Sequence, residues 1–286
     1  MVKELKAPTT YSEQIEILKS RGCVIGNDEI CEQHLKSVNY YRFTAYFLPF
    51  KDGDRYKTGT SFESVYELYE FDRKLRGILF SAIEEIEIFL RSQLSYYHAH
   101  KYGADGYLCE TSFSEKHNHQ KFKDSIAREI ENNRKALFVQ HHINNYDGVF
   151  PVWVVTELFT FGMLSYFSAD MKTTDQKHIA SSLYSAIPKN VISWLRCCTD
   201  LRNICAHYGR LYYRIFSAVP SGFAISDSAG RRLWGTVLAL RALYPNKEKW
   251  NHQILTALEA LFEEYSGVIN LYHIAFPADW KEQLAY

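Results

Sequence analysis

Hydrophobic residues recur at intervals of three or four positions over most of this chain, which is the period of an amphipathic helix. The clearest run predicts one long helix over residues 61–100. Its apolar stripe steps through Leu68, Phe71, Leu75, Ile78, Ala82, Ile86 and Phe89. Ser61 can cap the start of this helix with its hydroxyl group. The opposite face carries charged residues, so one side of the helix is expected to be buried.

The same pattern predicts shorter helices on both sides of the long one. Before it, helices are expected over residues 11–22 and 28–39, and an aromatic stretch over 38–50 should end at Pro49. After it, helices are expected over 115–136, 151–167, 174–184, 188–207, 231–243 and 247–265. Polar or glycine-containing segments predict loops at 51–60, 144–148 and 217–230. The expected fold is all-α: a helical domain over 61–286 with an N-terminal helical extension over 1–60 packed on it, forming one compact unit.

The composition agrees with a helical core and excludes several classes of protein. The chain has 286 residues, of which 47% are hydrophobic, so intrinsic disorder is excluded. Aromatic residues reach 15%, against only 14 Gly and 7 Pro, which favours helices with an aromatic core over loop-rich or all-β structure. Lys and Arg together equal Asp and Glu at 33 each, which excludes the indiscriminate coating of polyanions seen with strongly basic proteins.

Targeting signals and cysteine usage point to the cytoplasm. The first residues contain no apolar signal-peptide core, and no stretch reaches the roughly 18 apolar residues of a membrane span. The six cysteines are scattered and include no Cys-x-x-Cys pair, so reduced thiols are expected rather than disulfides or a zinc site. We therefore expect a cytoplasmic protein with no membrane contact, no cofactor and no metal.

One segment, residues 200–214, combines groups suited to phosphate chemistry. Motifs of common nucleotide-binding proteins, zinc proteases and serine hydrolases are absent from the chain. In this segment Asn203 and His207 are four residues apart and share a helical face, and the Arg202 side chain is long enough to reach them. Gly209 is expected to end the helix in a left-handed conformation. Arg202, Asn203 and His207 are thus predicted to converge on one phosphate as the catalytic groups.

The charges are concentrated around this segment. Residues 189–244 carry eight cationic and two anionic side chains, a formal charge of +6 in a chain that sums to zero. Seven of the eight cations are arginine, which makes bidentate contacts with phosphate, and tyrosines lie between them. Alternating arginine and tyrosine suit single-stranded RNA, whose bases stack on rings. The predicted RNA-binding residues are Arg196, Tyr208, Arg210, Tyr212 and Arg214.

Histidine and arginine together predict RNA cleavage without a metal. A base takes the proton of the 2′-hydroxyl, the oxygen attacks the adjacent phosphate, and an acid protonates the leaving 5′-oxygen. Purely structural roles remain open: Arg202 can pair with Asp200 or Glu87, and Asn203 can orient His207 or cap the helix. Glu87 and Arg91 are spaced as an ion pair on one helix, and we expect them to support the site.

Residues 202–207 resemble the Arg-x4-His motif of the HEPN superfamily. Over a wider range, segments 39–50, 71–91, 151–162 and 201–213, in that order, are similar to bacterial abortive-infection proteins of the AbiD/AbiF type. The resemblance implies a HEPN-like helical bundle, often dimeric, in which Arg and His from two protomers face one RNA-binding cleft. It also implies an antiphage role by cleavage of host or phage RNA, and for some relatives restraint by a small partner RNA. Relatives often carry a second histidine where this chain has Tyr208.

Three hypotheses follow. The first is an antiphage abortive-infection effector that acts as a metal-independent endoribonuclease and forms a homodimer. The second is a non-catalytic, toxin–antitoxin-like RNA-binding module that acts through a partner RNA or protein. The third is a helical interaction protein whose aromatic surface mediates assembly.

Overall fold

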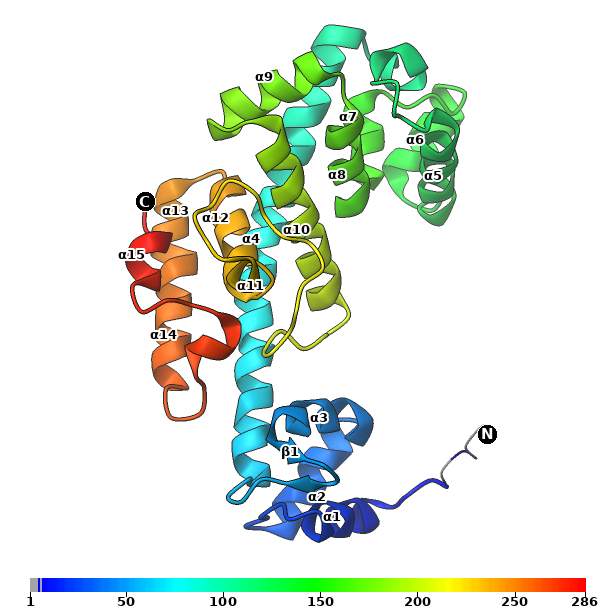
Figure 1. The fold of residues 1–286 in the computed structure, drawn as a ribbon. Coiled ribbons are helices and arrows are strands. Elements are labelled where there is room, and N and C mark those ends of the chain that lie inside the picture. Colours follow the sequence, from blue (N-terminus) through cyan, green and yellow to red (C-terminus); the bar gives the residue numbers. More distant parts are fainter. Residues whose placement is uncertain (1–4, 6) are drawn as a thin grey trace.

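The computed structural model describes Leu5 and residues 7–286, and nearly all of its regular structure is helical, which confirms the all-α prediction. One helix, α4 (Phe62–Tyr102), runs through the length of the molecule, and the other elements pack along it (Figure 1). At 1.5 Å per residue its 41 residues span about 60 Å. Ser61 caps its first turn by accepting a hydrogen bond from the Ser64 amide.

The N-terminal elements lie at the beginning of α4 (Figure 1). They are α1 (Tyr11–Ser20), α2 (Asp28–Ser37), α3 (Tyr40–Phe47) and the two-stranded antiparallel hairpin of β1 (Lys51–Asp52) and β2 (Arg55–Tyr56). The hairpin lies in a segment where the sequence predicts only a loop. The aromatic stretch forms α3, which ends in a 3-10 turn (Leu48–Phe50) containing Pro49.

The middle of the chain surrounds the C-terminal end of α4 (Figure 1). Its helices are α5 (His119–Asn132), α6 (Leu137–Asn145), α7 (Val152–Val155), α8 (Phe161–Asp170) and α9 (Thr173–Tyr184). The single helix expected over 151–167 is wrong, because the chain is extended at Phe159 and Thr160. Thr160 then caps α8 by accepting a hydrogen bond from the Met163 amide.

The last third of the chain packs along α4. Its first helix, α10 (Pro188–Ala206), contacts α4 directly, as do the helices near its end. The other helices of this part are α11 (Asp227–Gly230), α12 (Leu233–Leu243), α13 (Lys247–Lys249), α14 (Thr256–Glu264) and α15 (Trp280–Leu284). A π-helical turn (Trp250–Leu255) joins α13 to α14. Helix α10 contacts α4, α8 and α12, and α12 is buried over most of its length. Helix α10 is therefore packed against helices on several sides, whereas Asn203 and His207 at its end are exposed.

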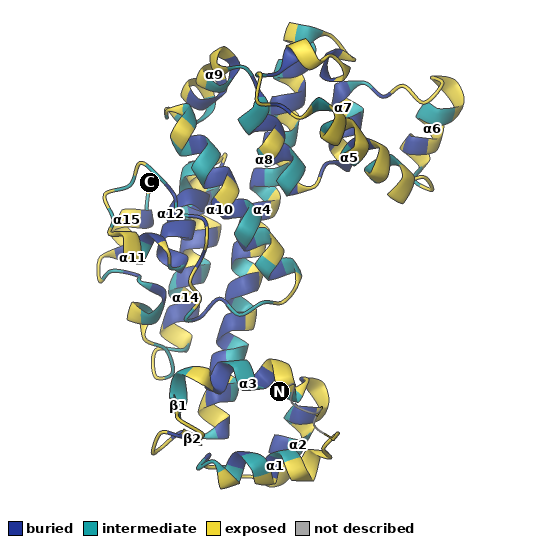
Figure 2. Ribbon diagram, turned by 45° about the vertical axis from the view of Figure 1, so that its right-hand side comes forward, coloured by how far each residue is buried: buried dark blue, intermediate teal, exposed yellow. Residues whose placement is uncertain are grey.

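About half of the aromatic residues are buried in the core and several more pack against it, and the buried positions follow the inner faces of the helices (Figure 2). Phe71 of α4, for example, contacts the rings of Tyr212, Phe262 and Tyr265. Such ring contacts join α4 to the segment after α10 and to α14. Among the described residues, no helix is long and apolar enough to span a membrane.

His98 is a buried histidine that the core holds without charge. Its ring lies 4.9 Å from Tyr102, 5.6 Å from Phe113 and 5.2 Å from Phe167, measured between ring centroids. Neither ring nitrogen has a hydrogen-bond partner among the described residues. Burial lowers the pKa of His98 to about 4.

We expect this histidine to make the fold sensitive to acid. In the unfolded chain a histidine has a pKa near 6.5, so at pH 4 to 6.5 the unfolded state binds more protons than the folded state. The stability that depends on neutral His98 is then fully present above pH 6.5. It is lost as the pH falls towards 4, by roughly 3 kcal/mol for a pKa shift of this size. His98→Phe should flatten this loss in urea denaturation at pH 7 and pH 4.5. Parallel pH profiles for the variant and the wild type would contradict the prediction.

Candidate functional site

Helix α10 ends in a turn built from backbone hydrogen bonds. The Gly209 amide donates to the Ile204 carbonyl (2.7 Å) and the Tyr208 amide donates to the Cys205 carbonyl (3.0 Å), which is a Schellman motif. The residue in the left-handed conformation is Tyr208, with φ of 56°, and the expectation that Gly209 takes it is wrong. A Cβ atom at 209 would lie 3.0 Å from the Cγ2 atom of Ile204, so a larger residue there would be tightly packed.

The segment after this turn is held by one buried carboxylate. Asp72 of α4 is 0% exposed and accepts hydrogen bonds from the backbone amides of Leu211 (3.1 Å) and Tyr212 (2.8 Å). It also accepts from the Tyr46 hydroxyl (2.8 Å) and forms an ion pair with Arg76. Burial raises the pKa of the Asp72 carboxyl, and the Arg76 guanidinium and these donors oppose that rise.

Two arginines tie the same turn to the rest of the molecule. Arg76 donates to the Gly209 carbonyl (3.2 Å), and Arg42 of α3 donates to the Tyr208 carbonyl (2.6 Å). The Arg42 guanidinium carbon also lies 5.9 Å from the centroid of the Tyr208 ring. The N-terminal extension therefore reaches the end of α10 directly. Sequence reasoning assigned no role to Asp72, Arg76 or Arg42.

The predicted catalytic residues occupy the last two turns of α10. His207 is the C-terminal capping residue and its side chain is exposed, as is that of Asn203. Arg202 is partly buried, and its Nε atom has no hydrogen-bond partner among the described residues. Neither of the ion pairs considered for Arg202 forms: within the described residues, Asp200 accepts from the Ser217 hydroxyl and Glu87 pairs with Arg91. The Arg202 guanidinium is thus not held in an ion pair within the described residues.

The predicted RNA-binding residues separate into an exposed and a buried set. Arg196, Tyr208 and Arg214 are exposed. Tyr212 is 2% exposed, and its hydroxyl is hydrogen-bonded to the Asn270 backbone, so a base cannot stack on it and this expectation is wrong. Arg210 is partly exposed, and one nitrogen of its guanidinium donates to the Ala45 carbonyl, so its contact with RNA stays a prediction.

Asn203 and Arg214 line a shallow groove beside the end of α10. It has a volume of about 350 Å³, and Asp200 and Ser217 form part of its wall. The groove has room for a small polar group, and Arg214 is a cation within its lining. An extended polyanion lying along this groove would meet Arg214 and the exposed last turn of α10.

The Glu87–Arg91 ion pair lies at a different contact, between α4 and the chain before α8. The guanidinium of Arg91 donates to the Glu87 carboxylate (2.9 Å) and to the Phe159 carbonyl (2.8 Å), and it lies 3.7 Å from the Glu157 carboxylate. These contacts join α4 to the extended residues before α8. The pair thus supports the packing next to α10 rather than supplying a group at the His207 turn.

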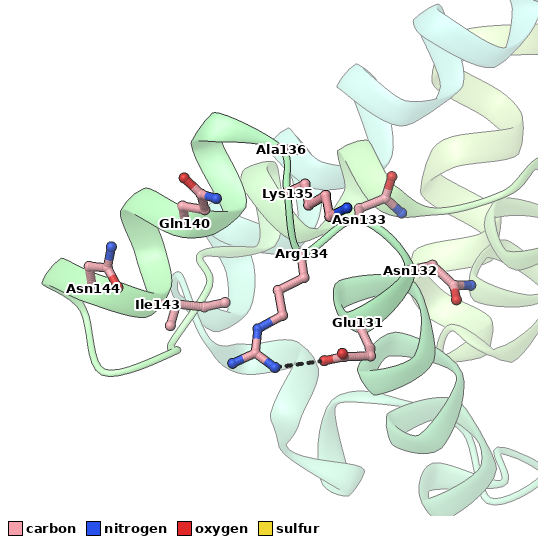
Figure 3. Close-up of a pocket in the computed structure, with 9 residues that line it drawn as sticks. All are labelled: Glu131, Asn132, Asn133, Arg134, Lys135, Ala136, Gln140, Ile143 and Asn144. Carbon is pink, nitrogen blue, oxygen red and sulfur yellow. Dashed lines mark ion pairs between the residues drawn. The ribbon is translucent and has the colours of Figure 1, made fainter.

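A larger hollow lies elsewhere, between α5 and α6 (Figure 3). Its volume is about 880 Å³, and polar side chains dominate its lining, including the ion pair of Arg134 with Glu131 (3.5 Å). Pockets for small organic ligands are mostly apolar, so this hollow does not fit one. None of the predicted site residues lines it. The types of residue present, rather than the size of a cavity, therefore make the end of α10 the candidate functional site.

Residues 33–213 match the sequence model of a family described as Abi-like protein. No curated protein and no solved structure matches the chain. The matched span covers more than half of the chain, and it includes Arg42, Asp72, Arg76 and the whole turn at the end of α10. The chain therefore belongs to the family of Abi-like proteins.

Proposed function

We propose that this protein is an abortive-infection effector that cleaves single-stranded RNA without a metal, in the manner of HEPN ribonucleases. The observation that carries the proposal is the end of α10, where an exposed His207 follows an Arg202 that forms no ion pair within the part of the chain that the structure describes. Membership of the Abi-like family supports a role in abortive infection. The hydrogen-bonded turn at the end of α10 would hold a catalytic group in a fixed position.

The proposed chemistry needs three groups. His207 transfers a proton, either from the attacking 2′-hydroxyl or to the leaving 5′-oxygen, because imidazole titrates near neutral pH. Arg202 stabilises the charge that develops on the phosphate. Asn203, exposed one turn before His207, donates a hydrogen bond to the same phosphate. The 2′-oxygen forms a bond to phosphorus while the bond to the 5′-oxygen breaks, which leaves a 2′,3′-cyclic phosphate and a 5′-hydroxyl.

A single motif histidine supplies one proton-transfer group, whereas the reaction uses a base and an acid. We therefore propose a homodimer in which the α10 ends of two protomers face one RNA strand. The location that follows from this role is the cytoplasm, where host and phage transcripts are found.

The test is cleavage of single-stranded RNA by the purified protein in the presence of EDTA. We expect products that end in a 2′,3′-cyclic phosphate, identified by mass spectrometry. RNA that stays intact at high enzyme concentration would exclude the ribonuclease.

The second candidate function is a non-catalytic RNA-binding module that acts through a partner RNA or protein. It is favoured by the tyrosine at 208, where relatives often carry a second histidine, since loss of that group removes one candidate for proton transfer. This alternative predicts RNA that copurifies with the protein and is released by salt, because phosphate contacts release counterions. It predicts no cleavage under any condition.

A further inference from the structure

We propose that Tyr208 and Arg42 form a stacking subsite for one unpaired base of a single-stranded RNA, next to the phosphate held at His207. The inference rests on the proposed function, and it assigns to α3 of the N-terminal extension a direct part in RNA recognition. It explains which features of the substrate the protein recognises beyond the phosphate that is cleaved.

Both side chains are exposed to solvent, and the guanidinium of Arg42 lies over one face of the Tyr208 ring. The Tyr208 ring is 68% exposed, and the Arg42 guanidinium lies 5.9 Å from its centroid. Arg42 is exposed as well, and within the described residues it has no carboxylate within 4.0 Å. Its bond to the Tyr208 carbonyl uses Nη1, so the other guanidinium nitrogens remain available for a phosphate.

The helix end does not require the Tyr208 side chain. Both hydrogen bonds of the turn, and the bond from Arg42, use backbone atoms of residue 208. A left-handed residue at this position is usually glycine, because a side chain is strained at positive φ. The turn therefore carries a tyrosine at a cost to the fold, and the ring faces solvent and Arg42 rather than the core. A ligand outside the fold accounts for both facts.

The occupant that fits is a base of single-stranded RNA. His207 and Tyr208 are consecutive, their Cα atoms are about 3.8 Å apart, and both side chains are exposed. A nucleotide whose phosphate contacts His207 would bring its base to this ring. Bases in a duplex are already stacked on each other and cannot add a further ring, whereas unpaired bases stack on tyrosine and arginine.

The test measures binding of a short fluorescent RNA whose riboses are 2′-O-methylated, so that the nucleophile is blocked and cleavage cannot intervene. Tyr208→Gly should weaken binding about 10-fold, because one stacked base contributes on the order of 1–3 kcal/mol. Tyr208→Phe should bind as the wild type does, since the ring is kept. Arg42→Ala should weaken binding as well. Tyr166→Ala on α8 and Arg128→Ala on α5 are matched controls, exposed residues of the same types at other places.

An oligonucleotide with abasic sites separates stacking from electrostatics. The wild type and Tyr208→Gly should bind it equally, because no base is present to stack. The Gly variant should also unfold at the same temperature as the wild type or at a higher one, since glycine relieves the strained backbone.

Three outcomes would overturn the subsite: wild-type affinity for Tyr208→Gly, an equal loss on the abasic strand, or no binding of RNA by the wild type. Cleavage plays no part in this measurement. If the protein binds RNA through Tyr208 but never cleaves it, the subsite is supported and the proposed ribonuclease activity is excluded. If the protein cleaves RNA but its binding does not depend on Tyr208, the ribonuclease activity is supported and the subsite is excluded.

Discussion

His207→Ala is expected to lower the rate of RNA cleavage at least 100-fold. A positioned general acid or base contributes a factor of about 10² to 10⁴, and alanine can transfer no proton. The substitution should leave the fold intact, because the His207 side chain is exposed. The backbone amide of His207, which donates to the Asn203 carbonyl, is retained in alanine. The measurement is initial cleavage rate in EDTA, with thermal unfolding followed in parallel.

A matched control for this prediction is His252→Ala. His252 is also an exposed histidine, on the π-helical turn before α14, and its loss should leave cleavage unchanged. Arg202→Lys tests the phosphate contact separately, because lysine keeps the charge and loses the bidentate geometry. Undiminished cleavage by His207→Ala would show that the histidine is not a catalytic group.

The long helices could be predicted from the sequence because their periodicity is uninterrupted. The stripe that predicted a helix over 61–100 corresponds to α4, and the helix predicted from Pro188 toward His207 corresponds to α10. The break at Phe159 and Thr160 was missed because both sides of it are apolar and compatible with a helix. Arg91 stabilises that break by donating to the Phe159 carbonyl from 68 residues away. The local signal was Thr160, a residue type that begins helices.

The directions of the site residues could be predicted only while they remained on α10. Periodicity placed Asn203 and His207 on one helical face, which the structure shows to be exposed, but beyond the helix end the chain has no period. There the backbone is fixed by hydrogen bonds that the Leu211 and Tyr212 amides donate to Asp72. The Tyr212 side chain is directed into the core. A contact over 139 residues leaves no trace in the local pattern of residues 208–214. The alternation of Arg and Tyr therefore predicted more exposed side chains in this segment than the structure shows.

The sequence did contain a sign of this contact. Asp72 follows Phe71 on the apolar side of α4, and Arg76 lies one turn later. A carboxylate on a buried face is costly unless donors surround it, so a charged pair inside an apolar stripe indicates a tertiary role. Which residues supply the donors depends on the fold.

Asp72→Ala is expected to lower the free energy of unfolding by about 3–5 kcal/mol. Removing this carboxylate leaves the Arg76 guanidinium buried without its counter-ion, and it leaves the amides of Leu211 and Tyr212 without an acceptor. Urea denaturation measures the effect. The matched control is Glu70→Ala, which removes a more exposed ion pair with Arg73 on the same helix and should cost less than 1 kcal/mol.

The double variant Asp72→Ala/Arg76→Ala separates an unpaired charge from a general loss of packing. Once Arg76 is also removed, no buried cation remains, so the double variant should be less destabilised than the sum of the two single variants. Additive losses would mean that the pair does not act as a unit. At temperatures where Asp72→Ala is still folded, its turn after α10 has lost its anchor. RNA cleavage should then fall further than the folded fraction does, because Asp72 holds the backbone that follows His207.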